Sequence, residues 1–179
     1  YFTGGSSGSL NIASVLPNNV DTITALALHN GFLIIFCEHN IIVYSGADNP
    51  LTASFAVSDV IAGVGCIARD SVQGTGNDLI FLSDTGIRSL GRLIQEKSLP
   101  MRDLTKNVRD DLLKDITQER INSGGLSKVR AVYSEINAFY LLSFPSTETI
   151  YCLDMRQAME DGSSRVTQWF SYKATALLR

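Results

Sequence analysis

The sequence has few of the residues from which catalytic and metal sites are usually built. Its 179 residues include only two histidines, three cysteines and one tryptophan. Cys37, Cys66 and Cys152 are unevenly spaced within apolar segments, which fits neither a disulfide framework nor a zinc pattern. Cys37 and His39 could share one face of a strand as metal ligands, but a third ligand is missing. We therefore interpret Cys37 as a core residue and His39 as a turn residue.

An excess of charge of one sign and long apolar runs are also lacking. With 15 basic and 18 acidic residues the net charge is -3. This balance removes any bulk electrostatic argument for binding nucleic acid or a membrane surface, although it does not exclude a local basic patch. No apolar run approaches the roughly 18 residues of a membrane span, and no secretory signal opens the sequence. A hydrophobic content of 45% is nevertheless ample for a buried core.

A repeat is the most informative feature that is present. Four segments share one pattern of small and apolar residues: Ile23–Leu28, Val64–Arg69, Val129–Ser134 and Ala174–Arg179. Each of the first three is followed by a second apolar run and then by a third strand-like segment. Equivalent positions in successive copies are 41, 65 and 45 residues apart, namely Ala25, Cys66, Ala131 and Ala176. The long interval contains a helical insertion, so the period is roughly 40 to 45 residues, the length of a four-stranded propeller blade.

The repeat predicts an all-β chain built from propeller blades of about four antiparallel strands, with one inserted helix. The expected units are a connector at 1–20, a first blade at 21–61, a second blade at 62–102, a helical insertion at 103–125, a third blade at 126–173 and the first strand of a further blade at 174–179. Propellers close with four to eight blades. We therefore expect the chain to be a fragment of a larger propeller.

The apolar run Phe32–Phe36 supports blades over a two-sheet sandwich. It is apolar at every position, which is typical of a strand buried on both faces, whereas a sandwich would predict alternation. The preceding Asn30-Gly31 pair tolerates the positive φ angles of a type I′ turn. This turn predicts a hairpin in which Leu28 pairs with Leu33.

The inserted helix is expected over Asp103–Ile121. Leu104, Val108, Leu112 and Ile116 recur every four residues and form a narrow apolar stripe, Asp103 is placed to cap the start, and Gly124 follows the end.

We interpret the other face of this helix as solvated, with ion pairs from Lys106 to Asp110 and from Asp110 to Lys114. It carries Arg109, Asp110, Asp111, Lys114, Asp115, Glu119 and Arg120. By position alone, Arg109, Asp110, Lys114 and Arg120 are candidates for a contact between subunits.

Two arginines are candidates for a central channel. Arg69 and Arg179 end two copies of the segment that would form the innermost strand of a blade, and innermost strands line the channel of a propeller. The alternative is that both simply end a solvent-exposed strand. Nothing brings Asp70, Asp78 and Asp84 together as a hydrolase would require, and no serine has the context of a nucleophile. We expect no enzyme activity and no catalytic, cofactor or metal site.

The order of segments resembles the propeller region of tail nozzle and tail-stabilisation proteins (tail tubular B-like) of short-tailed bacteriophages. The resemblance rests on Asp21–Phe36, Ile41–Gly46, Pro50–Thr52, Gly65-Cys66, Leu79–Leu90, Asp103–Val108, Tyr151–Arg156 and Val166–Trp169. It covers most of residues 21–173. Two departures are Cys37, where Thr is common, and Ala53, where Pro is expected.

This resemblance implies a structural protein of the virion, located in the phage tail. It further implies a homo-hexameric ring below a portal and an adaptor, with double-stranded DNA leaving transiently through the lumen. The alternatives are a cellular propeller that acts as an interaction platform or adhesin, and a propeller hydrolase. The Gly-His and Trp-Asp pairs of WD-type repeats are absent from the sequence, which counts against the commonest interaction platform.

Overall fold

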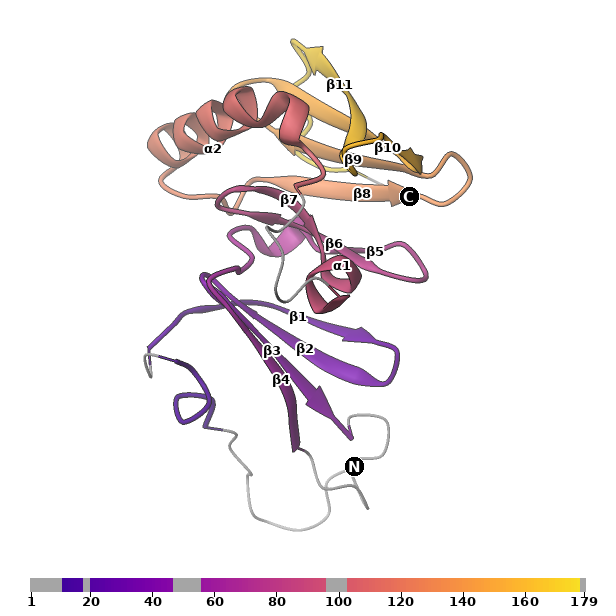
Figure 1. The fold of residues 1–179 in the computed structure, drawn as a ribbon. Coiled ribbons are helices and arrows are strands. Elements are labelled where there is room, and N and C mark those ends of the chain that lie inside the picture. Colours follow the sequence, from indigo (N-terminus) through magenta and orange to yellow (C-terminus); the bar gives the residue numbers. More distant parts are fainter. Residues whose placement is uncertain (1–10, 18–19, 47–55, 96–102, 178–179) are drawn as a thin grey trace, which may run out of the picture.

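The computed structural model describes residues 11–17, 20–46, 56–95 and 103–177 (Figure 1). The chain is mostly β, with 44% strand and 17% helix. Its strands form three antiparallel sheets, two of four strands and one of three. The expectation of a mainly β chain with an inserted helix is therefore confirmed.

The first sheet contains four strands in sequence order: β1 (Ile23–His29), β2 (Phe32–Cys37), β3 (Asn40–Ser45) and β4 (Ala56–Ala62). Asn30 and Gly31 have φ angles of 50° and 79°, as a type I′ turn requires. Leu28 pairs with Leu33, so the predicted register is confirmed.

The second sheet contains three strands and leads into a short helix: β5 (Gln73–Gly74), β6 (Leu79–Ser83), β7 (Gly86–Ser89) and α1 (Leu90–Gln95). The segment Val64–Arg69 was expected to be its first strand, and that prediction is wrong. The amide of Cys66 donates to the carbonyl of Cys37 in the first sheet at 2.8 Å, whereas Ile67 donates to Leu82 in the second at 3.0 Å. Because the segment bridges two sheets, it cannot pair along one, and it ends in the 3-10 turn η1 (Arg69–Ser71).

The third sheet again has four strands: β8 (Arg130–Ser134), β9 (Phe139–Phe144), β10 (Thr149–Ala158) and β11 (Ser164–Phe170). The copy of the repeat at Ala174–Arg179 does not form the expected strand in its described part, 174–177. The carbonyl of Ala174 instead accepts a bond from the Ser143 hydroxyl at 3.0 Å. This segment therefore rests against the third sheet.

The inserted helix α2 (Arg109–Ser123) begins later than predicted, after the 3-10 turn η2 (Lys106–Val108). Asp103 does not cap it. Its Oδ1 accepts bonds from the amide and hydroxyl of Thr105, at 2.8 and 2.6 Å, and so fixes a turn before the helix. Gly124 ends the helix with a φ of 69°, as expected. The apolar stripe is confirmed at Leu112 and Ile116, which are buried.

The solvated face predicted for α2 is wrong at two positions. Glu119 is completely buried and accepts bonds at 2.8 Å from the Ser123 hydroxyl and the Ser146 amide. Asp115 accepts a bond from the Tyr151 hydroxyl at 2.7 Å, and burial raises the pKa of its carboxyl. Both carboxylates thus attach α2 to the third sheet, because the turn between β9 and β10 brings the Ser146 amide to this face and β10 brings the Tyr151 hydroxyl.

The predicted ion pairs on α2 are replaced by others. Lys106 lies 3.6 Å from a carboxyl oxygen of Asp161 rather than pairing with Asp110. Lys114 pairs with Asp111 at 3.4 Å, three residues away on the same helix. Asp161 lies in the turn between β10 and β11, far from Lys106 in the sequence. Helical spacing therefore could not predict this ion pair.

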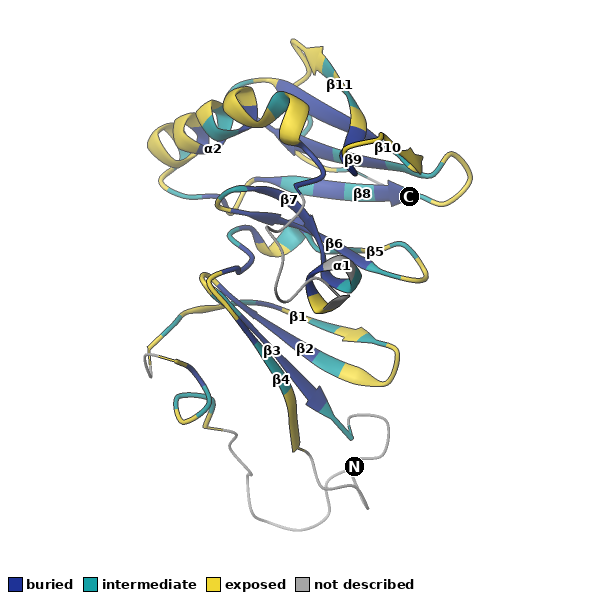
Figure 2. Ribbon diagram, viewed as in Figure 1, coloured by how far each residue is buried: buried dark blue, intermediate teal, exposed yellow. Residues whose placement is uncertain are grey.

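The three sheets are stacked in series, with the second in the middle (Figure 1). Phe81 of β6 packs into a core shared with the first sheet, whereas its neighbours Ile80 and Leu82 pack into a core shared with the third sheet and α2. Figure 2 shows this burial along the central strands. A strand between two sheets has no solvent face, which explains its uninterrupted apolar run.

The run Phe32–Phe36 follows the same rule for three of its five residues. Ile34, Ile35 and Phe36 are buried, and Ile35 faces a separate small core that includes Leu16. Phe32, at the hairpin end, is 37% exposed. Burial on both faces is therefore limited to the part of β2 that lies between neighbouring elements.

Candidate functional site

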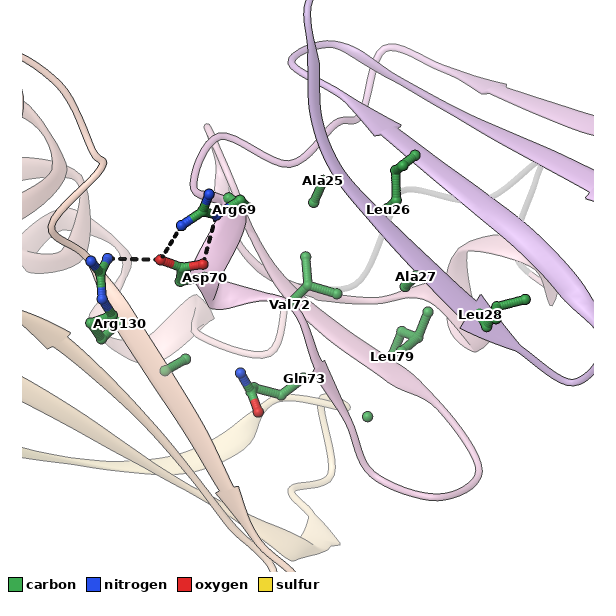
Figure 3. Close-up of a pocket in the computed structure, with 12 residues that line it drawn as sticks. Ala25, Leu26, Ala27, Leu28, Arg69, Asp70, Val72, Gln73, Leu79 and Arg130 are labelled. Atoms are coloured by element: carbon green, nitrogen blue, oxygen red, sulfur yellow. Dashed lines mark hydrogen bonds and ion pairs between the residues drawn. The ribbon is translucent and has the colours of Figure 1, made fainter. Parts of the chain in front are cut away.

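The first strands of the sheets lie side by side at one edge and enclose a groove of about 480 Å³ (Figure 3). One wall is β1, the floor is the segment from η1 through β5, and the other wall is the start of β8. Leu26 and Leu28 of β1 are 63% and 71% exposed. We name this feature the edge groove. It draws on all three sheets, so it exists only when they are stacked.

An ion cluster occupies one end of the edge groove. Arg69 binds Asp70 with two parallel bonds, from Nε to Oδ1 at 2.8 Å and from Nη2 to Oδ2 at 3.1 Å. Nη1 of Arg130, on β8, lies 2.9 Å from Oδ2 of the same carboxylate. Figure 3 shows Asp70 between the two guanidinium groups.

The electrostatics of this cluster follow from its geometry. The bonds donated by Arg69 hold the pKa of Asp70 below its ordinary value, and Arg130 acts in the same direction. Arg130 is held further by the carbonyls of Ser127 and Val129, at 2.5 and 2.9 Å. A carboxylate kept ionised in this way is a poor proton acceptor, so the cluster is not suited to acid–base chemistry.

Sequence reasoning found part of this site. Arg69, one of the two candidates for a channel, lines the edge groove, although it belongs to η1 rather than to a strand and its side chain is 72% exposed. Arg179 lies outside the described residues. Arg130 is not among the predicted site residues, and Asp70 is a candidate only as an acid that a hydrolase would need. Arg130 is the second residue of its copy, and that charged position was the available signal.

The other acidic candidates do not join the cluster. Asp78 accepts bonds at 2.7 Å from the amides of Leu79 and Gly91, which fixes the start of α1. Asp84 accepts a bond from the hydroxyl of Ser83 at 2.9 Å. Each of these acids therefore stabilises the backbone or a turn near its own place in the second sheet.

The Cys37 and His39 pair does not have the geometry of a metal site. Cys37 is completely buried, whereas the backbone amide of His39 donates to the carboxylate of Asp21 at 3.1 Å in a turn. Across the described ranges, no group of three or more His, Cys, Asp or Glu side chains could hold a metal ion.

The four candidates for a subunit contact remain together on α2. Arg109, Asp110, Lys114 and Arg120 are all exposed and none lines the edge groove. Nε of Arg109 lies 3.8 Å from Oδ2 of Asp103. The helix therefore presents a surface of mixed charge.

The buried thiols give a first testable prediction. Cys37, Cys66 and Cys152 are free and buried, and burial raises the pKa of each, to about 11 for Cys37. Because the thiolate is the reactive form, we expect Ellman's reagent to modify none of the three in the folded protein near neutral pH. The denatured chain should release three equivalents. A fast-reacting thiol in the folded protein would contradict the packing described above.

Comparison with known proteins adds no relative: neither a scan against protein-family models nor a search of curated proteins finds a match. Within the described ranges, no helix combines the length and apolar character that crossing a bilayer would require.

Proposed function

We propose that this chain is an arc of a β-propeller in the tail nozzle or tube wall of a short-tailed bacteriophage, with the edge groove facing the conduit for DNA. The observation that carries the proposal is the serial stacking of three antiparallel sheets whose first strands meet along one groove. Blades arranged around the axis of a propeller have this relation, because the first strand of each blade lies nearest that axis. This relation supports the propeller arc, and the orientation of the groove toward the conduit is the part of the proposal that the labelling experiment below tests. The resemblance to nozzle propellers supplies the biological context.

The strand orders support the same arrangement. In the first and third sheets, the strands follow one another from the groove outward, ending at β4 and β11. The segment Cys66–Ile67 bridges from the first sheet to the second, where the next blade would begin. A sector of a propeller accounts for both features, whereas a two-sheet sandwich accounts for neither.

In the assembly that we propose, six copies form a ring in the virion tail, below a portal and an adaptor. The exposed face of α2, with Arg109, Asp110, Lys114 and Arg120, would contact a neighbouring subunit or the adaptor. Its mixed charge suits a polar contact of this kind. The stacked cores suit a rigid wall of the tail conduit. The chain would contact double-stranded DNA only transiently, as the DNA passes.

A cellular interaction platform or adhesin is the alternative, and one observation favours it. Trp169, Phe170 and Tyr172, at and just beyond the outer strand β11, are 40%, 63% and 58% exposed. Trp169 and Tyr172 line a shallow hollow of about 390 Å³ with Ile150. Aromatic side chains are enriched where proteins bind one another.

Cryo-electron microscopy of particles that contain this chain tests the proposal. We expect six copies of the three-sheet unit around an axial channel. A gold label on an Arg69→Cys variant should lie near the axis, whereas a label on the matched Arg120→Cys variant should lie further out. The buried native thiols leave the introduced cysteine as the reactive one. A propeller that lies alone, outside any ring, would contradict the proposal and favour the interaction platform.

A further inference from the structure

We propose that Asp70 masks Arg69 and Arg130, so that the wall of the edge groove does not hold the phosphates of passing duplex DNA. This inference rests on the proposed function, because it takes the edge groove to face the conduit. The effect of Asp70 on DNA binding can be measured with the isolated chain, without the assembled ring.

The edge groove carries a small positive charge. Among the described residues that line it, Arg69, Asp70 and Arg130 are the only charged ones. Two arginines and one aspartate leave a local charge of +1, and removing the carboxylate would raise it to +2. Asp70 therefore halves the positive charge that this wall presents.

The Asp70 carboxylate occupies the position at which the two arginines could bind a phosphate. A guanidinium group binds carboxylate and phosphate in the same way, through two parallel N–H donors. Asp70 already occupies such a pair on Arg69, at 2.8 and 3.1 Å, and its Oδ2 also takes a donor of Arg130 at 2.9 Å. It thus stands where a phosphate would otherwise bind.

A phosphate from solvent would compete with Asp70 for the Arg69 guanidinium group. The Arg69 side chain is 72% exposed, so a phosphate could reach it from solvent. An exposed ion pair contributes little net stability. Asp70, however, is the next residue in the chain and returns at high effective concentration, and its negative charge repels the incoming phosphate. A phosphate would have to displace this internal partner, which suits a wall along which DNA slides.

The experiment compares the binding of a short DNA duplex to the wild type and to Asp70→Asn by fluorescence anisotropy. Asparagine keeps the shape but removes the charge. We expect Asp70→Asn to bind the duplex about three- to tenfold more tightly near 50 mM salt. The slope of the logarithm of the binding constant against the logarithm of the salt concentration should become steeper by roughly 1 to 2, since each phosphate contact adds about 0.9 to this slope. Asp70→Ser serves as a second variant if the amide disturbs η1.

Two controls make the test specific. Glu160→Gln changes the net charge by the same amount at an exposed position outside the groove, and should leave the affinity unchanged. Adding Arg69→Gln and Arg130→Gln to Asp70→Asn lowers the local charge to zero and should reduce the affinity to that of the wild type or below it. An unchanged affinity in correctly folded Asp70 variants, or equally tight binding without the arginines, would overturn the inference. Failure to find a ring by microscopy would instead count against the proposed function, so the two failures are distinguishable.

Discussion

Replacing Gly65 with alanine is expected to lower the free energy of unfolding by about 3 kcal/mol or more. A Cβ atom at this position would overlap the backbone carbonyl oxygens of Cys37 and Glu38. These atoms cannot move aside easily, because the Cys37 carbonyl also accepts the bond from the amide of Cys66 at 2.8 Å. The substitution therefore forces apart the junction between the first and second sheets. Urea denaturation followed by circular dichroism measures the effect.

Gly74→Ala is the matched control for this prediction. Its new Cβ would have Leu79 Cδ2 as its nearest neighbour, at 3.9 Å, which is an ordinary contact. We expect a change within about 0.5 kcal/mol. If Gly65→Ala unfolded at the same urea concentration as the wild type, the close approach of the two sheets at this point would be wrong.

Phe81→Ala is expected to cost about 3 to 5 kcal/mol of stability. Phe81 is completely buried between the first two sheets, and its ring centroid lies 4.9 Å from that of Phe36. Removing the ring leaves a cavity in the middle of the stack, where neighbouring strands are held by hydrogen bonds and cannot close in. The unfolding midpoint in urea or on heating reports the loss.

Phe170→Ala is the control, because the same ring is removed from a side chain that is 63% exposed. We expect it to change the stability by no more than about 0.5 kcal/mol. Equal losses for Phe81→Ala and Phe170→Ala would contradict the assignment of Phe81 to the core between the sheets.

Gly65 and Phe81 both lie at the boundary between the first and second sheets, and this boundary also forms part of the edge groove. Val72, just before β5, and Leu79 of β6 pack there with Ala25 and Ala27 of β1. A loss of stacking should therefore disturb the groove as well as the stability. The charge variants at Asp70 act differently, because this carboxylate lies at the surface and removing its charge leaves the cores intact.

Several local features of this protein follow from residues that are neighbours in the sequence. The Asn30-Gly31 pair predicted both the first hairpin and its register, because a tight turn sets the pairing of its flanking strands. Gly124 predicted the end of the helix. The continuous apolar run Phe32–Phe36 predicted burial on both faces correctly only for Ile34, Ile35 and Phe36. These features depend on residues close together in the chain, so a pattern of neighbours was sufficient to predict them.

Contacts between groups far apart in the sequence depend on the tertiary fold. Val64–Arg69 looks like a strand, but its amides bond to two different sheets. Glu119 looks solvated, but the turn that follows β9 supplies its buried partners. Arg130 joins Asp70 only because β8 packs beside η1. The repeat spacing predicts successive sheets, but hydrogen-bond and ion partners depend on which side chains come together when those sheets stack, and a local pattern does not specify them.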